Sequence, residues 1–159
     1  MNRVYLLLGS NMGNNKVQLS KAVVHIEKQI GRVTRRSNLY ATAAWGNTEQ
    51  PDFLNQVIIT ETNLTAPETM QTILRIEEKM GRVRTVKNAP RIIDIDILFF
   101  NKEIIDQQQL IVPHPQIQNR RFVLVPLNQL SPNLLHPVLK KTVHQLLIHC
   151  PDKLNVKKF

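Results

Sequence analysis

The sequence predicts an α+β sandwich in which a mainly antiparallel sheet is backed by helices. Short β-branched apolar runs and longer stretches with helical spacing follow one another along the chain. The 159 residues are enough for one domain with a sizeable core. The apolar fraction of 42% and the charged fraction of 21% are ordinary for a globular protein.

In the first half of the chain, short apolar runs flank one stretch of helical spacing. We expect a buried strand, a helix, a weak strand, an irregular stretch and a clear strand, over residues 4–8, 16–30, 32–39, 40–50 and 53–62. The helix is indicated by Leu19, Val23 and Ile26, and Gly31 ends it. The loop after Gly9 is turn-rich, but it lacks the Gly-Lys-Ser/Thr of a P-loop.

The second half opens with a well-marked helix that runs to Met80. Thr65 and Glu68 form a capping-box pattern, with Pro67 in the first turn. The apolar stripe that follows consists of Met70, Ile73, Leu74 and Met80. Glu77 falls on the same stripe, where a carboxylate is either paired with a cation or turned toward a ligand.

The remaining elements complete the fold prediction. We expect a buried strand, a polar turn, a rigid proline-containing segment and two helices, over residues 91–100, 102–110, 112–115, 119–130 and 142–150. The order strand–helix–strand–strand–helix–strand indicates a ferredoxin-like sandwich. The C-terminal third is then a helical extension of that core.

Charge and cysteine content narrow the function classes. The formal net charge is +9 and the pI is about 10.1, which permits nucleic-acid binding. However, no acid occurs between Asp106 and Asp152, so missing acids contribute to the positive balance. The single cysteine, Cys150, and an N-terminal apolar run of only five residues favour a cytoplasmic protein without a signal peptide or membrane span.

Two acids interrupt the apolar strand at residues 91–100. Asp94 and Asp96 are two residues apart, so on a strand they point to the same face, roughly 6–7 Å apart. They are either the wet face of an edge strand or the ligands of a divalent metal such as Mg²⁺. Four nearby cations, with no acid between Met80 and Ile93, favour a metal and polyphosphate site: Arg82, Arg84, Lys87 and Arg91.

Six short motifs, taken in order, carry a resemblance to a known family. They are Leu8-Gly9-Ser10-Asn11, Gln50-Pro51-Asp52-Phe53-Leu54-Asn55, Gly81-Arg82-Val83-Arg84, Pro90-Arg91-Ile92-Ile93-Asp94-Ile95-Asp96-Ile97, Val112-Pro113-His114 and Asn119-Arg120-Arg121-Phe122. Together they resemble 6-hydroxymethyl-7,8-dihydropterin pyrophosphokinase (HPPK), a family of the folate pathway. The resemblance implies a single domain over residues 1–159 and a Mg²⁺-dependent transfer of pyrophosphate from ATP to the dihydropterin, leaving AMP. It also implies two Mg²⁺ ions bound with ATP.

The resemblance further assigns roles to individual residues. Asp94 and Asp96 correspond to metal ligands, and the catalytic set is Arg82, Arg91 and Asp96, where Asp96 or a water accepts the proton. The ATP-binding positions are Arg84, Ile97, His114 and Arg120. The pterin positions are Thr42, Ala43, Trp45, Phe53, Asn55 and Phe122, with the two phenylalanines stacking on the ring and Asn55 contacting its amide edge.

The chain also departs from the family pattern near the aspartate strand. Residues 87–91 are one residue shorter and lack the tryptophan that often covers the site, and Pro115 follows His114 where a tyrosine is common. Residues 83–90 hold few apolar side chains, so we expect a lid that orders when both substrates bind. We expect a monomer with no nucleic-acid or membrane partner. The alternatives are a non-catalytic RNA-binding domain on the same fold and a pterin-binding regulator without activity.

Overall fold

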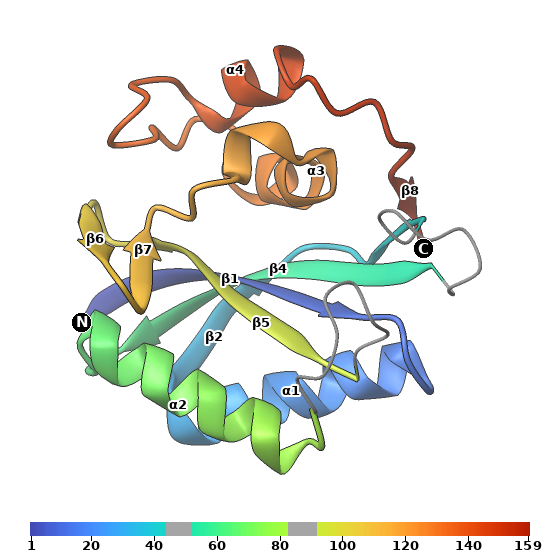
Figure 1. Ribbon diagram of the computed structural model, residues 1–159, viewed down its shortest axis with the longest axis vertical. Helices are drawn as coiled ribbons and strands as arrows, with labels where there is room; N and C mark the ends of the chain where they lie inside the picture. The colour runs from blue at the N-terminus through green and yellow to red at the C-terminus, as the bar shows by residue number, and fades with distance from the viewer. Residues whose placement is uncertain (44–51, 83–91) are drawn as a thin grey trace.

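A computed structural model describes residues 1–43, 52–82 and 92–159. Across these ranges a twisted sheet lies between two layers of helices (Figure 1). The strands of this sheet are β1 (Asn2–Ser10), β2 (Gly31–Arg36), β3 (Tyr40–Thr42), β4 (Phe53–Thr62), β5 (Asp94–Phe100) and β8 (Lys157–Lys158). All of its paired neighbours are antiparallel.

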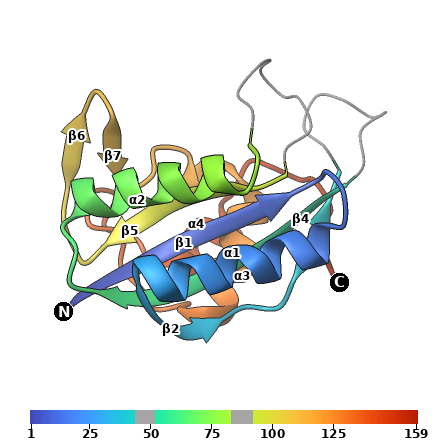
Figure 2. The same cartoon turned by 90° about the horizontal axis from the view of Figure 1, so that it is seen from below.

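The strand order agrees with the predicted α+β sandwich. The sheet runs β5-β1-β4-β3-β8, and β2 also pairs with β4. The core elements follow one another in the chain as β1, α1 (Asn15–Gln29), β2, β4, α2 (Ala66–Lys79) and β5. Both helices lie on one face of the sheet (Figure 2). The prediction of an antiparallel sheet backed by helices is therefore confirmed.

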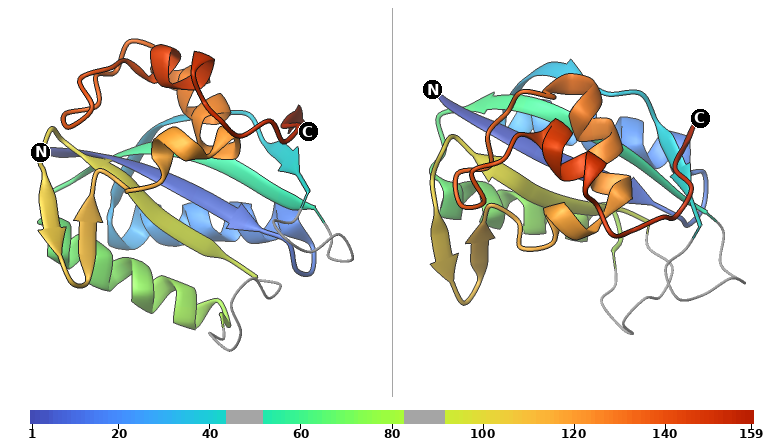
Figure 3. Two further views of the ribbon diagram at one scale, coloured as in Figure 1. Left: turned by 45° about the horizontal axis from the view of Figure 1, so that its top comes forward. Right: turned by 90° about the horizontal axis from the view of Figure 1, so that it is seen from above.

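The C-terminal third covers the opposite face. It contributes the hairpin of β6 (Ile105–Gln107) and β7 (Leu110–Val112), the 3₁₀ turn η1 (Ile117–Asn119), α3 (Arg121–Leu130) and α4 (Val143–Ile148). Figure 3 shows α3 and α4 packed over the strands on the side away from α1 and α2. The predicted helical extension thus closes a second layer.

Each face of the sheet has its own apolar core. Leu6 and Ile58 pack with α1 and α2, whereas Leu7, Val57 and Phe99 pack with α3 and α4. A sheet that is covered on both faces needs apolar residues at successive positions. This explains why the strands appear in the sequence as continuous apolar runs.

The capping signals in the sequence form as expected. Thr65 Oγ1 accepts the N–H of Glu68, whose carboxylate accepts the N–H of Thr65, so the predicted capping box is present. A second capping box, between Thr142 and Gln145, starts α4. Among the described residues, no helix is long and apolar enough to cross a bilayer.

Several local predictions were wrong. Residues 40–42 form β3 instead of an irregular stretch, and the polar turn after β5 includes the hairpin β6–β7. In α2, Leu74 is 39% exposed, and Ile76 takes the buried position instead. These short strands depend on partners distant in the chain, which local composition does not reveal.

Candidate active site

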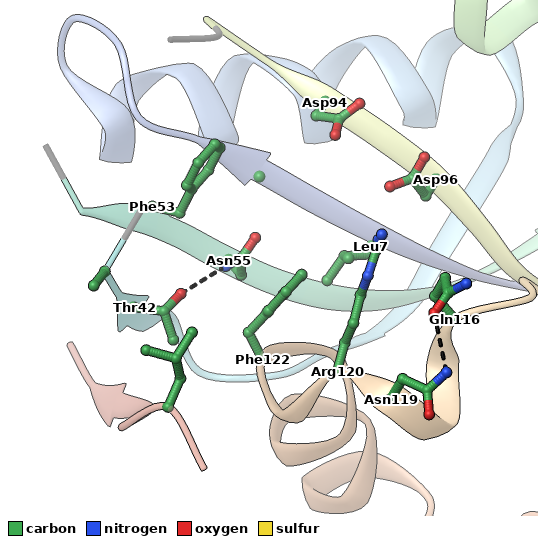
Figure 4. Close-up of a pocket in the computed structure, with 13 residues that line it drawn as sticks. Leu7, Thr42, Phe53, Asn55, Asp94, Asp96, Gln116, Asn119, Arg120 and Phe122 are labelled. Atoms are coloured by element: carbon green, nitrogen blue, oxygen red, sulfur yellow. Dashed lines mark hydrogen bonds between the residues drawn. The ribbon is translucent and has the colours of Figure 1, made fainter. Parts of the chain in front are cut away.

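A cavity of about 450 Å³ opens on the face of the sheet that α3 covers. Side chains from four strands, from the η1–α3 region and from the segment after α4 converge on it (Figure 4). Among the described residues, its lining includes Leu7, Gly9, Thr42, Ala43, Phe53, Asn55, Asp94, Asp96, Gln116, Asn119, Arg120, Phe122 and Leu154. The cavity therefore joins segments that are distant in sequence.

Asp94 and Asp96 enter the cavity from β5. They lie opposite Gly9 and Leu7 in the register of β5 with β1, and both point to the same side of the strand (Figure 4). Although β5 is the edge strand, the side chain of Asp94 is only 23% exposed. The carboxylates thus face a partly enclosed cavity and not an open wet surface, and two carboxylates so placed suit a divalent cation.

A chain of charges fixes the start of β5. Arg82 Nη1 donates to Glu77 Oε2 and to Asp94 Oδ1, each at 2.7 Å. Glu77 Oε2 also accepts the backbone N–H of Ile95 at 2.9 Å, although the Glu77 residue is only 2% exposed. Burial opposes the charge of Arg82, but the two carboxylates outweigh it and raise its pKa. Of the two interpretations of Glu77, the structure shows the ion pair.

The protonation of Asp96 is set by its surroundings. Burial, together with the negative charges of Asp94 and Glu77, raises the pKa of Asp96 to about 7. Arg120 and Arg82 act in the opposite direction, without cancelling the effect. A cation placed between the carboxylates would relieve the same repulsion.

The other end of the cavity can hold a flat, polar-edged ring. Asn55, which is 4% exposed, donates from Nδ2 to Thr42 Oγ1 at 3.3 Å. Phe53 enters from β4 and Phe122 from α3 (Figure 4). The guanidinium of Arg120 lies 5.8 Å from the centroid of the Phe122 ring. Aromatic side chains around a buried amide provide both stacking surface and hydrogen-bonding groups.

Gly9 leaves room for Asn55. A Cβ atom at Gly9 would approach Asn55 Oδ1 to 2.7 Å, which is closer than real Cβ contacts. The Asn55 amide therefore depends on the absence of a side chain on the neighbouring strand. Gly9 belongs to the first of the sequence motifs, although its own role was not predicted.

The predicted site residues divide into three groups. The cavity brings together Thr42, Ala43, Phe53, Asn55, Asp94, Asp96, Arg120 and Phe122. Arg82 reaches the site through its ion pair with Asp94. Trp45, Arg84 and Arg91 lie outside the described residues, as does the expected lid at residues 83–90.

Two predicted ATP contacts lie outside the cavity lining. Ile97 is 5% exposed and packs in the core under α1 and α2, so any contact with a ligand would come from its backbone. His114 donates its backbone N–H to Leu98 O, and its Nδ1 accepts the N–H of Gln116. Burial and nearby Arg120 lower the pKa of His114 to about 4, so its ring is neutral at pH 7.

The cavity also contains residues that the sequence did not single out. Asn119 Nδ2 donates to Gln116 Oε1 at 3.0 Å, and both side chains line the cavity beside Arg120. Their signal is weak, because polar residues in a proline-containing loop are common. Leu154 has no local signal at all, since only the tertiary fold brings it to the cavity.

The sequence of the chain is similar to those of known proteins. Residues 5–132 match the sequence model of the family described as 7,8-dihydro-6-hydroxymethylpterin-pyrophosphokinase (HPPK). The 2-amino-4-hydroxy-6-hydroxymethyldihydropteridine pyrophosphokinase of Methylorubrum extorquens is 41% identical over 136 residues, covering 85% of this chain and 86% of that protein. The protein of the same name from Aquifex aeolicus is 37% identical over 145 residues, covering 91% and 90%.

Some matches are to longer proteins. The folic acid synthesis protein FOL1 of Dictyostelium discoideum is 36% identical over 155 residues, which cover 98% of this chain but only 23% of that protein. A crystal structure of Plasmodium falciparum HPPK-DHPS, wild type with pterin and p-hydroxybenzoate, aligns with a TM-score of 0.73 at 22% identity. It covers 92% of this chain and 42% of that one, and at this identity it supports the fold alone.

Proposed function

The chain belongs to the 7,8-dihydro-6-hydroxymethylpterin-pyrophosphokinase family, and we propose how its own residues carry out the reaction of that family. It is a pyrophosphokinase of folate synthesis, which transfers a pyrophosphoryl group from ATP to the hydroxymethyl group of 6-hydroxymethyl-7,8-dihydropterin. Such a transfer asks the protein for positioning and positive charge more than for covalent chemistry.

One observation supports this proposal above all others. A single cavity holds residues suited to a heterocycle and, within the same walls, two carboxylates suited to a metal–phosphate complex. Phe53 and Phe122 stack on the pterin, and Asn55 hydrogen-bonds its amide edge. Thr42 orients Asn55 through their hydrogen bond, and Ala43 adds apolar wall. Trp45 completes this set from outside the described residues.

The residues present fit Mg²⁺. Asp94 and Asp96 supply two carboxylates on one side of β5, and the described residues contain no group of three or more acidic, histidine or cysteine side chains arranged around a metal. This small set suits Mg²⁺, which takes its remaining ligands from water and substrate phosphates. When bound, the two expected ions would neutralise the triphosphate and lower the pKa of the attacking hydroxyl.

The cationic residues act on the group being transferred. Arg82 is held at the site by Glu77 and Asp94, so its charge is already positioned before substrate arrives. Arg120 projects into the cavity beside Phe122, where it can contact phosphate oxygens (Figure 4). Arg84 and Arg91, outside the described residues, add positive charge, and His114 binds the nucleotide as a neutral ring. Ile97 contributes a backbone contact.

Asp96 is the group to which we assign the proton of the attacking hydroxyl. Its carboxylate lines the same cavity as Asp94 and the proposed pterin residues, so the attacking hydroxyl can approach it. A water is the alternative acceptor. Either way, the hydroxymethyl oxygen must approach β5, which orients the pterin with its ring toward Asn55.

We propose that residues 1–159 form one domain, and the two apolar cores that share one sheet support this. We assign it a monomeric, cytoplasmic role, with ATP and the dihydropterin as its ligands and with no nucleic-acid or membrane partner. The lone cysteine, Cys150, is buried and free, as suits a reducing compartment.

A single assay tests the proposal against its alternatives. The protein is incubated with ATP, Mg²⁺ and 6-hydroxymethyl-7,8-dihydropterin, and the nucleotide products are separated. We expect one AMP for each pterin consumed and no turnover without Mg²⁺. Accumulation of ADP would contradict pyrophosphoryl transfer, and pterin binding without turnover would favour the regulator. RNA binding that persists without Mg²⁺ and is not displaced by ATP would favour the RNA-binding alternative.

A further inference from the structure

We infer that the segment at residues 151–159 is part of the substrate site and that Leu154 is a specificity-determining residue for the pterin. This inference rests on the proposed placement of the pterin beside Asn55. The segment lies beyond residues 5–132, which match the family. Nevertheless, Leu154 lines the same cavity as Asn55.

One end of the segment is anchored to the start of α3. Asp152 Oδ2 accepts the backbone N–H of Arg121, and Asp152 Oδ1 accepts the N–H of Leu154, each at 3.0 Å. A carboxylate is also favourable at this position, because the first N–H groups of a helix lack partners within it. The Asp152 side chain thus links the backbone of Leu154 to the helix turn that carries Phe122.

The other end is anchored to β3. Ala41 and Tyr40 pair with Lys157 and Lys158 in β8, and the N–H of Phe159 donates to Leu39 O at 2.8 Å. Figure 1 shows the segment leaving α4 and descending to β8 near the C-terminus. Since β3 also leads to Thr42 and Ala43, the segment connects two walls of the cavity.

This geometry gives Leu154 a defined chemical role. Its half-buried aliphatic side chain adds apolar surface to a cavity that Leu7, Ala43, aromatic rings and polar groups also line. It carries no charge, so its size changes the shape of the site without changing the field around Asp94 and Asp96. Leu154 is therefore suited to select the outline of the heterocycle and not to take part in the transfer.

Binding measurements on full-length variants test this role. We expect Leu154→Ala to weaken binding of 6-hydroxymethyl-7,8-dihydropterin about fivefold, measured with a saturating non-hydrolysable ATP analogue and Mg²⁺. Binding of the analogue alone should change by less than about twofold, since Leu154 lies at the pterin end. Leu74→Ala is the matched control, because Leu74 is 39% exposed on α2 and should change neither affinity.

Asn55→Ala separates the inference from the proposed function. If Asn55→Ala weakens pterin binding strongly and Leu154→Ala leaves it unchanged, the role of Leu154 is refuted while the pterin placement stands. If Asn55→Ala has no effect on pterin binding, the placement itself is wrong, and the role of Leu154 falls with it.

Asp152 is a positioning residue in the same scheme. We expect Asp152→Ala to raise KM for the pterin about threefold with little change in kcat, because the wall moves and the reacting groups do not. Asp152→Asn should restore only part of this loss, since its amide oxygen replaces one of the two carboxylate oxygens that accept the N–H groups of Arg121 and Leu154. A lower thermal midpoint for Asp152→Ala with an unchanged KM would assign Asp152 to stability alone and overturn the positioning role.

Discussion

The two faces of the sheet are built from alternate residues of the same strands and each holds an apolar core, yet the cavity lies on the face under α3 and not on the face under α1 and α2. On β5, Ile95 and Ile97 pack under α1 and α2, whereas Asp94 and Asp96 line the cavity under α3. The register that buries Ile95 and Ile97 under the helices therefore also points Asp94 and Asp96 into the cavity. A slip of one residue would exchange the two sets, so stability and function constrain each other along each strand.

The two faces also differ in how they treat ionisable groups. Among the described residues, burial is the main cause of a shifted pKa at three positions. It raises the pKa of Asp96 and lowers the pKa of His114 and of His136. All three lie on the side of the C-terminal layer, in the cavity, beside Arg120 or against Phe99. Stability on this face should therefore respond to pH more strongly than on the face under α1 and α2.

Asp96→Asn should give the largest effect on activity. Removing one of two metal-binding carboxylates is expected to lower kcat about a thousandfold. The unliganded protein should instead become more stable at pH 8, because the variant removes a carboxylate that must be charged in a partly buried site. Initial rates at saturating Mg²⁺ and thermal midpoints without ligand provide the measurement.

The pH dependence of this gain follows from the shifted pKa. The folded-state pKa of Asp96 is raised from 3.8 to about 7, so between these values the native protein binds a proton that the unfolded chain releases. Native stability therefore falls as pH rises through this window, and Asp96→Asn should remove that fall. The two proteins should match near pH 4. A variant that keeps a tenth of the activity would exclude Asp96 from the site.

Ile95→Ala tests the opposite face of the same strand. Ile95 is 2% exposed beneath the helices, so its truncation should lower the free energy of unfolding by about 3 kcal/mol. Activity per folded molecule should stay within about twofold of wild type, because the side chain points away from the cavity. Urea unfolding and rates measured below the transition provide the comparison. A loss of kcat comparable to that of Asp96→Asn would show that the faces are not separable.

Gly9→Ala sharpens the comparison inside the cavity. The new Cβ would meet Asn55 Oδ1 at 2.7 Å, so the amide must rotate or the strands must separate slightly. We expect pterin affinity to fall about tenfold, while the affinity for the ATP analogue changes little. Calorimetric titration with each ligand distinguishes these effects. Equal losses for both ligands would indicate a general distortion of the site.

The sequence predicts the elements of the face under α1 and α2 better than it predicts the walls of the cavity. The helix α2 has its capping box and stripe within one stretch, and β4 has its apolar run, so local patterns suffice for both. By contrast, β3 and β8 have few residues, and they become strands only by pairing, β3 with β4 and β8 with β3. The resemblance supplied Phe53 and Asn55, whereas Leu154 reaches the cavity only through the tertiary fold, which no local pattern encodes.

His136 gives the smallest expected effect, and it tests whether the C-terminal layer is the pH-sensitive one. The residue is 4% exposed, and its Nδ1 accepts the N–H groups of Val138 and Leu139 at 3.2 and 3.0 Å. Its ring also meets Phe99 edge to face, with centroids 5.7 Å apart. An Nδ1 that accepts hydrogen bonds must be unprotonated, and burial lowers the pKa of His136 accordingly.

The sign of the His136 effect is fixed by that lowered pKa. Its contribution to stability is complete above the ordinary pKa of 6.5 and is lost as pH falls below it. His136→Asn keeps an oxygen that can accept the two N–H groups but cannot be protonated in this range. The variant should therefore lose less stability than wild type between pH 7 and pH 5. His144→Asn, at an exposed position, is the control and should follow wild type. Identical pH profiles for wild type and His136→Asn would place the acid sensitivity elsewhere on this face, and His114, whose pKa is also lowered by burial, would then be the next group to substitute.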